Sequence, residues 1–336
     1  MKTKQTDECR LLTLRQTARF LKKNENYVIL THASPDGDTL GAAYALYYGL
    51  KELGKEASVI CPDIIPKKYN YFVHETDHIT RDKATVLAVD VATPSLLGSL
   101  REEFADSVVL NIDHHVSNSH YAKNLCLDAT AAATCEIIYE LLLALRVNIN
   151  TVTAKALYTG LATDTGCFKY SNVTAKTHEI AAQLYEYDID ASEINRLMFD
   201  TKSRKLLELE RMVLDTAEYH FANKCILLTV TAEMQEKTGC GGSELEGIAV
   251  ISRSVEGVEV GITLKQTDEF EYKASLRTFP PLDASEICKK LGGGGHAGAA
   301  GATLHGGLDE VKNQILTAVK ETMEEVYAGI VTSGQA

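Results

Sequence analysis

Aspartate and histidine residues gather in four short motifs in the first half of the chain. Eight of them are candidates for chemistry: His32, Asp36 and Asp38 in THASPDGD, Asp90 in VDVA, Asp113, His114 and His115 in NIDHH, and Asp164 in ATDTG. Carboxylate oxygens mixed with imidazole nitrogens favour Mn²⁺ or a similar divalent ion over a thiolate-type zinc site. Carboxylates that lie close together in a buried site repel one another unless cations neutralise them. The residue types therefore predict a divalent metal centre.

Three of the four motifs also have an ordinary structural explanation. Asp38 could cap a helix that begins near Thr39, in a turn that binds no ligand. The Asp113–His115 run could be a polar loop, and Asp164 could belong to the last turn of a helix. The metal site is the better interpretation only because so many acidic and imidazole side chains are expected in one place, where they would be costly without a cation.

A centre with two metal ions would support a particular reaction. Two divalent ions bridged by one carboxylate, about 3.5 to 4 Å apart, lower the pKa of a water to about 7 and hold the attacking and leaving oxygens of a phosphate ester. Hydrolysis of a phosphoester is therefore the expected reaction.

The four motifs can form one site only if they lie together at one edge of a sheet. The pattern of the first half of the chain predicts such a sheet. Short, nearly continuous apolar runs, typical of parallel strands covered on both faces, occupy residues 27–32, 57–61, 85–90 and 107–113. Helical patterns lie between them, notably at residues 41–54. This alternation predicts an α/β fold with a doubly wound, mainly parallel sheet. Such sheets bind ligands at the carboxyl ends of their strands, where three of the runs end in His32, Asp90 and Asp113.

The composition changes near residue 190. The segment from there to Tyr219 is charged and free of glycine and proline, which predicts a connecting helix. Two hairpin-like runs, VEVGITLKQ and FEYKASLRT, follow it, and a tetraglycine loop and a final amphipathic helix come next. We expect a metal-binding catalytic domain over residues 1–190, a helical linker over 191–217 and a smaller α/β substrate-binding domain over 218–336. The active site is expected in the cleft between the two domains.

The second half contains one segment suited to anion binding. Glycines allow positive φ angles and let successive N–H groups face an anion, and a histidine beside them could donate to a phosphate. The candidate substrate ligands are Gly293, Gly294, Gly295 and His296 in GGGGH, together with Arg277 in SLRT. A flexible linker is the alternative for the glycine run, although the AGAAGATL stretch after it is typical of packed chain. Arg277 could equally be a surface residue, although its guanidinium could bind a phosphate with two nitrogens.

Length and charge exclude several classes of protein. A chain of 336 residues predicts two domains that fold without disulfides or structural zinc. Its net charge of -12 argues against binding of long duplex nucleic acid, which requires a basic surface. The eight cysteines form no C-x-x-C pair, no apolar run reaches the roughly 20 residues of a membrane span, and the N-terminal residues lack a secretory cleavage pattern. We therefore expect a cytoplasmic protein with no membrane partner.

Taken together, the motifs resemble those of the DHH phosphoesterase family, which is named for the run seen here as Asp113-His114-His115. THASPDGD, VDVA, NIDHH, GLATDTGCF and GGGGHAGAAG occur in the order of that family over nearly the whole chain. GGGGH resembles the mark of the family's DHH-associated C-terminal domain. Within the family, a two-domain chain of this size is similar to the bifunctional oligoribonuclease and 3′-phosphoadenosine 5′-phosphate (pAp) phosphatase group.

The resemblance implies a role for each candidate residue. The first Mn²⁺ would be held by His32, Asp36 and Asp90, and the second by Asp38, Asp90, His114 and Asp164, with Asp90 as the bridge. His115 would contact the scissile phosphate, and Asp113 would orient His114 or its neighbours. Arg277, Gly293, Gly294, Gly295 and His296 would hold the rest of the nucleotide.

The resemblance also implies the reaction. It predicts a phosphodiesterase and phosphatase with two Mn²⁺ ions per active site, which releases nucleoside 5′-monophosphates from short RNA oligonucleotides, dinucleotides such as pApA, and pAp. A homodimer is left open. One alternative is a manganese-dependent inorganic pyrophosphatase or exopolyphosphatase, whose C-terminal domain lacks the glycine-histidine loop. The other is a nonhydrolytic nucleotide sensor, which would be expected to have lost a metal ligand.

Overall fold

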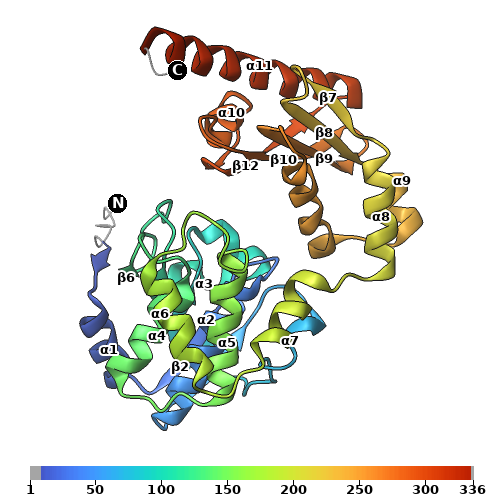
Figure 1. The fold of residues 1–336 in the computed structure, drawn as a ribbon. Coiled ribbons are helices and arrows are strands. Elements are labelled where there is room, and N and C mark those ends of the chain that lie inside the picture. Colours follow the sequence, from blue (N-terminus) through green and yellow to red (C-terminus); the bar gives the residue numbers. More distant parts are fainter. Residues whose placement is uncertain (1–8, 334–336) are drawn as a thin grey trace, which may run out of the picture. The chain divides into compact units, whose positions relative to one another are not determined.

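The computed structural model describes residues 9–333, which divide between Thr201 and Lys202 into two compact units (Figure 1). The first eight residues, on which part of the expectation about secretion rests, lie outside the described range. Within that range no helix is both long enough and apolar enough to cross a bilayer.

The first unit is built on a parallel sheet. Its strands, in spatial order, are β1 (Arg10–Leu11), β6 (Asn124–Leu127), β5 (Val108–Asp113), β4 (Thr85–Val89), β2 (Asn26–Leu30) and β3 (Glu56–Ile60), each parallel to its neighbours. The chain leaves β2 for β3 on one side and then returns to form β4 on the other side. Open α/β sheets bind ligands at such a switch point, at the carboxyl ends of the strands.

Helices cover both faces of this sheet. They are α1 (Leu14–Lys23), α2 (Gly37–Glu52), α3 (Arg101–Phe104), α4 (Thr134–Leu145), α5 (Thr151–Asp164), α6 (Ala175–Tyr185) and α7 (Ala191–Asn195). Side chains alternate along β2, so Tyr27 and Ile29 join the core under α2, α4 and α5, whereas Val28 and Leu30 pack on the other face with Leu97. The prediction of a doubly wound α/β sheet is therefore confirmed.

The start of α2 differs from the explanation in which Asp38 caps a helix near Thr39. The helix begins at Gly37, and its N-cap is Asp36, whose Oδ1 accepts hydrogen bonds from the backbone N–H groups of Asp38 and Thr39. Asp36 has the extended backbone of an N-cap residue, whereas Asp38 already lies inside the first turn. The side chain of Asp38 is thus available for another role.

We expected the charged segment after residue 190 to form one continuous helix, but the structure shows that it is interrupted. After α7 a π-helical turn covers Arg196–Asp200, and α8 begins only at Arg204 (Arg204–Leu214). Thr201 is extended, and the hydroxyl of Ser203 accepts a hydrogen bond from the N–H of Leu206, so the sequence starts a new helix there. Leu209 of α8 is buried in the core of the second unit.

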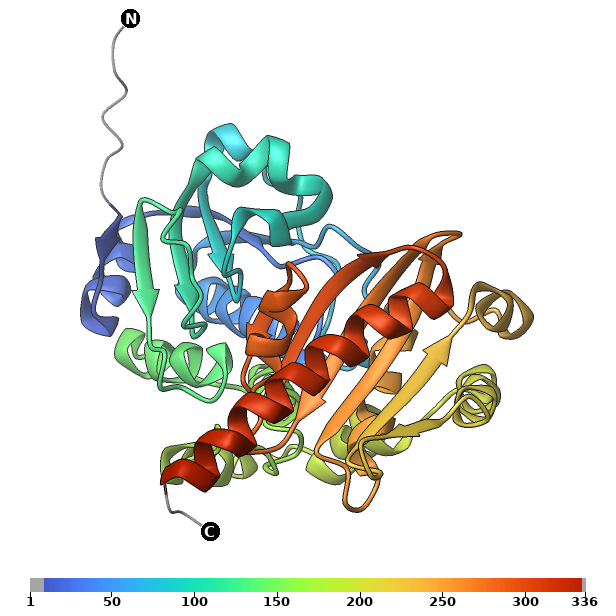
Figure 2. The same ribbon diagram turned by 90° about the horizontal axis from the view of Figure 1, so that it is seen from above.

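The second unit has a mixed sheet of six strands. In spatial order these are β11 (Gly294–His296), β12 (Ala299–His305), β10 (Glu271–Thr278), β9 (Val260–Asp268), β8 (Cys225–Val230) and β7 (Glu218–His220), and only the β8–β9 pair is parallel. One face packs against α10 (Ala284–Lys290) and α11 (Leu308–Ser333), the long helix that crosses the sheet in Figure 2. On the other face, α8, α9 (Ala232–Thr238) and the 3₁₀ segment Gly242–Ser254 cover the strands near β8.

Candidate metal centre

The carboxyl ends of β2 and β4 bring three of the candidate ligands together. His32 follows β2, Asp36 caps α2, and Asp90 follows β4. The Nε2 atom of His32 lies 3.6 Å from Oδ1 of Asp36 and 3.6 Å from Oδ2 of Asp90. Its Nδ1 atom lies 2.8 Å from the carbonyl oxygen of Ala33, which fixes the ring with Nε2 toward the two carboxylates. These three side chains form one group that could hold a metal ion.

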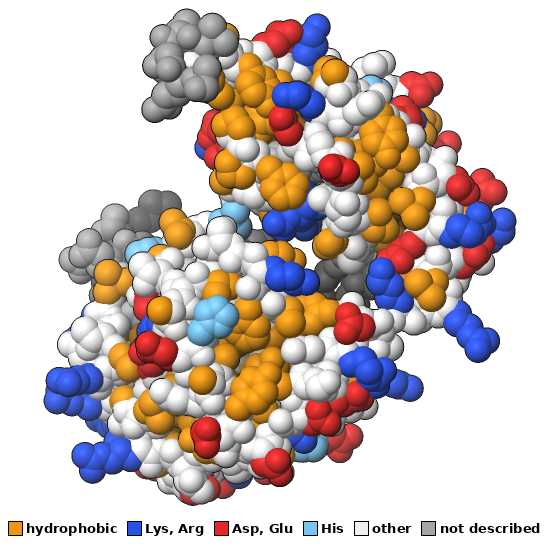
Figure 3. Space-filling model, viewed as in Figure 1, with side chains coloured by type: hydrophobic (Ala, Val, Ile, Leu, Met, Phe, Trp, Pro, Cys, Tyr) orange, Lys and Arg blue, Asp and Glu red, His pale blue; other side chains and the backbone are white. Residues whose placement is uncertain are grey.

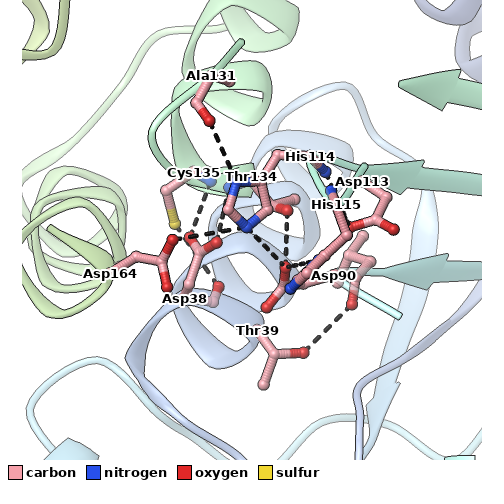
Figure 4. A network of polar contacts seen from close by, with 12 residues as sticks. Asp38, Thr39, Asp90, Asp113, His114, His115, Ala131, Thr134, Cys135 and Asp164 are labelled. Carbon is pink, nitrogen blue, oxygen red and sulfur yellow. Dashed lines mark hydrogen bonds and ion pairs between the residues drawn. The ribbon is translucent and has the colours of Figure 1, made fainter. Parts of the chain in front are cut away.

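A second group lies beside the first. Nε2 of His114, after β5, lies 3.5 Å from Oδ2 of Asp164 at the end of α5, and Asp38 completes the group (Figure 4). Asp38 is almost fully buried, and its two carboxylate oxygens accept hydrogen bonds from the backbone N–H groups of Thr134 and Cys135, at 2.6 and 2.9 Å. This carboxylate therefore serves as the N-cap that α4 lacks in its own sequence, because Ala133 precedes the helix.

Asp90 lies between the two groups. Its Oδ2 faces His32, and its Oδ1 lies 3.7 Å from Nε2 of His114. The residue has a left-handed backbone, with φ 59, which turns the chain sharply after β4 and leaves the side chain nearly buried. A carboxylate with one oxygen toward each group has the arrangement of a bridging ligand.

His115 and Asp113 form a separate pair. Oδ1 of Asp113 lies 2.8 Å from Nδ1 of His115 and also accepts hydrogen bonds from the backbone N–H groups of His114 and His115. Its Oδ2 accepts a hydrogen bond of 2.6 Å from the amide of Asn118. Burial raises the pKa of Asp113, but these hydrogen bonds outweigh burial and lower it below its ordinary value. Asp113 is therefore an anionic support for His115.

His115 also lies near Asp90 and His114, in a third group that could hold a metal ion. Its Nδ1 atom, 3.5 Å from Oδ1 of Asp90, is 0.7 Å closer to Asp113 than to that oxygen. A nitrogen that shares a proton with Asp113 cannot also donate its lone pair to a metal ion. This geometry argues against Nδ1 of His115 as a metal ligand.

The acidic groups disturb one another strongly in the metal-free protein. Burial, followed by the charge of Asp90, raises the pKa of Asp38 to about 7, and burial together with the charges of Asp38 and Asp90 raises the pKa of Asp164 well above its ordinary value. Burial opposes the charged form of His32, but contacts with Asp36 and Asp90 outweigh it and raise the pKa to about 11. Bound protons therefore neutralise part of the negative charge in this site. Divalent cations could neutralise it instead.

The spacing of the ligand atoms suits a divalent ion. The pairs described above lie 3.5 to 3.7 Å apart. Metal–ligand distances of about 2.0 to 2.2 Å place neighbouring ligand atoms about 3 to 3.5 Å apart in tetrahedral or octahedral sites. These histidine–carboxylate pairs are thus within a few tenths of an ångström of the spacing around a bound ion, and hard oxygen ligands with imidazole suit Mn²⁺ and similar ions.

The candidate residues of the second unit lie on one face of its sheet. Arg277 of β10 and His296 of β11 both pair with Ala299 of β12, so the three residues form a row across three strands. Residues directly opposite one another in a sheet point to the same face. This face is the more exposed one along β10, because Tyr272 and Leu276 point into the core on the other side.

The tetraglycine segment is only partly the loop that we expected. Gly294 and Gly295 pair with Gly301 and Ala300, so the glycines run into a short edge strand that includes His296. A Cβ on Gly293 would lie 2.2 Å from the carbonyl oxygen of Gly301, and Gly295 has φ 148. Close approach of two backbones, besides conformational freedom, therefore explains why this segment is built from glycine.

Sequence reasoning missed two residues of the metal centre. Thr134 donates its hydroxyl to Oδ1 of Asp90 at 2.9 Å, and Asn118 holds Asp113. Nothing in the sequence distinguishes Asn118 from the other residues of a polar loop. For Thr134 a weak signal exists, because the helix that it begins is preceded by Ala133, which cannot cap, so its N–H groups need a partner elsewhere.

Two family descriptions match this chain. Residues 26–161 match the N-terminal domain of the DHH family, which contains β2 to α4 and most of α5. Residues 223–325 match the DHHA1 domain, which contains β8 to β12 and most of α11.

Two named bacterial proteins are similar to this chain over most of its length. One from Thermus thermophilus, the bifunctional oligoribonuclease and PAP phosphatase NrnA, is 35% identical in an alignment of 320 residues, and the match covers 92% of this chain and 94% of that protein. Its namesake from Bacillus subtilis is 25% identical in an alignment of 295 residues, and the match covers 85% of this chain and 92% of that protein.

Solved structures show the same fold. An exopolyphosphatase-related protein from Bacteroides fragilis superposes with a TM-score of 0.83 at 24% identity, over 92% of this chain and 95% of that chain. RecJ from Thermus thermophilus, in complex with Mn²⁺, superposes with a TM-score of 0.54 at 16% identity, over 91% of this chain and 55% of that chain.

Proposed function

This chain belongs to the DHH family, and from that premise we propose that it is an enzyme that hydrolyses short oligoribonucleotides, dinucleotides such as pApA, and pAp to nucleoside 5′-monophosphates. The family follows from 35% identity to a relative that the chain matches over nearly its whole length. Oligoribonucleotides and pAp are the substrates in the names of the two relatives, oligoribonuclease and PAP phosphatase, and pApA is a short substrate of the same chemical class.

One structural observation supports metal-dependent phosphoester hydrolysis independently of the family. Segments from four places in the sequence deliver four carboxylates and two imidazoles into two adjacent groups, and Asp90 of the first group turns its other oxygen toward His114 of the second. A site for binding only a neutral ligand would gain nothing from carboxylates that raise one another's pKa. A site for divalent cations and a phosphate requires such a set.

Two Mn²⁺ ions are the cofactor that we propose. His32, Asp36 and Asp90 would hold one ion, and Asp38, Asp90, His114 and Asp164 would hold the other. When bound, such a pair of ions activates a water and neutralises charge on the phosphate.

The protein's own residues have distinct tasks in this scheme. Oδ1 of Asp113 accepts a hydrogen bond from the Nδ1–H group of His115, and this contact directs Nε2 of His115 away from the carboxylate. From there Nε2 would donate a hydrogen bond to an oxygen of the scissile phosphate. Asn118 keeps Asp113 in this orientation through its other oxygen.

Arg277 and His296 would recognise the nucleotide part of the substrate. Both are charged or polar, both flank Ala299, and both are on the more exposed face of the second sheet. A guanidinium can bind a phosphate with two nitrogens, and the N–H groups near Gly294 and Gly295 can add further donors.

The test is a comparison of substrates. Metal-stripped protein is supplied with Mn²⁺ and then with pAp, pApA or pyrophosphate, and released AMP and phosphate are measured. We expect AMP from both nucleotides and no turnover of pyrophosphate. Turnover of pyrophosphate alone would favour the inorganic pyrophosphatase alternative, and binding of nucleotide without any product would favour a sensor.

A further inference from the structure

The N-terminus of α4 contacts both parts of the metal centre. The helix has no capping side chain of its own, and the backbone N–H groups of Thr134 and Cys135 donate to the two oxygens of Asp38 instead. These residues are distant in sequence, so the contact joins α4 to the first turn of α2. The partial positive charge at a helix N-terminus also favours a carboxylate at this position.

The hydroxyl of Thr134 makes a different contact. It donates to Oδ1 of Asp90 at 2.9 Å, and the residue is fully buried (Figure 4). Buried threonines in helices commonly return the hydroxyl to a carbonyl of the preceding turn, as Thr17 does with Thr13 in α1. Thr134 instead donates to a carboxylate that is 44 residues away in the sequence.

This hydrogen bond decides how the carboxylate of Asp90 is turned. Oδ1, the oxygen that Thr134 contacts, is the one that faces His114, and Oδ2 faces His32. A carboxylate that serves two groups must keep each oxygen on its own side. A single directional donor on one oxygen is enough to fix that rotation, since the other oxygen then has only one direction left.

We propose that Thr134 is a positioning residue of the metal centre, which holds Asp90 in its bridging orientation through the hydroxyl and Asp38 through the backbone N–H. The proposal rests on the proposed function only in that the two groups bind metal ions. It assigns Thr134 no contact with substrate or with a metal ion.

The experiment compares three variants. Thr134→Val has nearly the same shape but no donor, Thr134→Ser keeps the donor, and Thr17→Val removes a matched buried hydroxyl from α1. Mn²⁺ is titrated into each metal-stripped protein by calorimetry, and kcat and KM for pApA are measured separately. We expect Thr134→Val to bind Mn²⁺ about 10 to 100 times more weakly, as is usual when a residue that orients metal ligands is lost.

The controls separate positioning from general stability. Thr134→Ser should bind Mn²⁺ within a few-fold of the wild type, and its kcat should recover with it. Thr17→Val should lower the melting temperature without any change in Mn²⁺ affinity. In Thr134→Val the loss should fall on kcat, with KM for pApA little changed, because the hydroxyl does not face substrate.

Unchanged Mn²⁺ affinity and stoichiometry in a folded Thr134→Val protein would overturn the proposal. Should this variant fail to fold, Thr134→Ala, which has no β-branch to pack, replaces it with the same expected loss of affinity. The titration and the activity assay of the wild type distinguish failure of this proposal about Thr134 from failure of the proposed function. Tight Mn²⁺ binding that depends on Thr134, with no hydrolysis of any nucleotide, would refute the proposed function and leave the role of Thr134 standing.

Discussion

At the scale of single residues, the backbone conformation of Asp90 determines which substitution can test its role in the metal centre. Its φ of 59 lies in the left-handed region, which asparagine and aspartate tolerate and alanine adopts at a cost of about 1 kcal/mol. Alanine at this strand end, although small enough, therefore changes the backbone energy as well as the ligand set. Asparagine is the cleaner replacement.

We predict that Asp90→Asn folds with a near-wild-type melting temperature and loses catalysis by at least about a hundredfold, as expected for a carboxylate that serves both metal ions. The amide oxygen can still accept the hydrogen bond from Thr134, so the fold around α4 should persist. Circular dichroism, Mn²⁺ stoichiometry and turnover of pApA check the three parts. Wild-type turnover with two bound Mn²⁺ ions would mean that Asp90 is no bridge.

A pH dependence of stability follows from the same cluster. In the metal-free protein the pKa of Asp38 rises from 3.8 to about 7, and that of His32 rises from 6.5 to about 11. The folded state then binds more protons than the unfolded state between these values, so its stability falls as the pH rises, first from about 4 to 7 through Asp38 and then above 6.5 through His32.

We therefore expect chelator-treated protein to melt at a lower temperature at pH 8 than at pH 5.5. Adding Mn²⁺ at pH 8 should raise the melting temperature, because bound cations replace the missing protons. Differential scanning fluorimetry over this range is sufficient. A metal-free protein that gains stability up to pH 8 would contradict the charge balance described for the site.

At the scale of elements, the close crossing of α2 and α5 positions Asp38 and Asp164. A Cβ on Gly41 of α2 would lie 2.4 Å from the backbone carbonyl of Ala156 and 3.0 Å from Sγ of Cys135. Backbone cannot move aside without shifting α5. The glycine is therefore required for packing, although glycine lowers the intrinsic stability of a helix.

We predict that Gly41→Ala lowers the free energy of unfolding by about 1 to 3 kcal/mol, which is typical of overpacking. Gly329→Ala in α11 is the matched control, since nothing lies within 4 Å of its Cβ position and the residue is exposed. That change should be neutral or should stabilise the helix by about 0.5 to 1 kcal/mol. Urea denaturation compares the two, and equal effects would show that the α2–α5 crossing relaxes easily.

In the second unit, the row Arg277, Ala299 and His296 is the proposed site of nucleotide recognition. We predict that His296→Ala raises KM for pAp and pApA and leaves bound manganese unchanged, because His296 belongs to β11 and none of the metal-binding groups includes it. His305→Ala, which removes an exposed imidazole from the end of β12, is the control and should alter neither. Elemental analysis that showed manganese loss in His296→Ala would move this residue into the metal shell.

At the scale of the whole molecule, we expect the net charge to limit the length of the substrate. The chain has a net charge of -12, and Lys and Arg side chains are scattered among Asp and Glu over the face drawn in Figure 3. The three strands that carry the row contain two cationic residues, Arg277 and Lys273. They are four residues apart on one face of β10, about 13 Å at about 3.3 Å per residue.

We predict that kcat/KM is highest for mono- and dinucleotides such as pAp and pApA and falls steeply as the oligonucleotide lengthens. Extra phosphates would need further clustered cations to gain binding energy. A series from two to about 24 nucleotides, longer than the roughly 4 to 16 of a typical single-strand site, measures this directly. Efficiency that stays constant or rises with length would indicate a processive exonuclease.

Local sequence patterns were sufficient to predict the parallel sheet and the types of ligand. Apolar runs ending in His32, Asp90 and Asp113 predicted strands whose carboxyl ends share an edge, because parallel strands in a doubly wound sheet must align there. Local patterns are enough for this, since each run and its final polar residue are neighbours in the chain. The four-residue strand β6 and the two-residue strand β1 were not anticipated, because so few residues establish no period.

The tertiary structure decided how those residues are used. Asp38 caps α4, Asp90 turns one oxygen to each group, and Thr134 holds it there across 44 residues of sequence. The pairing of Arg277 and His296 with Ala299 likewise depends on strand register. Such relations are hydrogen bonds between segments that only folding brings together, and no spacing within the chain encodes which oxygen meets which donor.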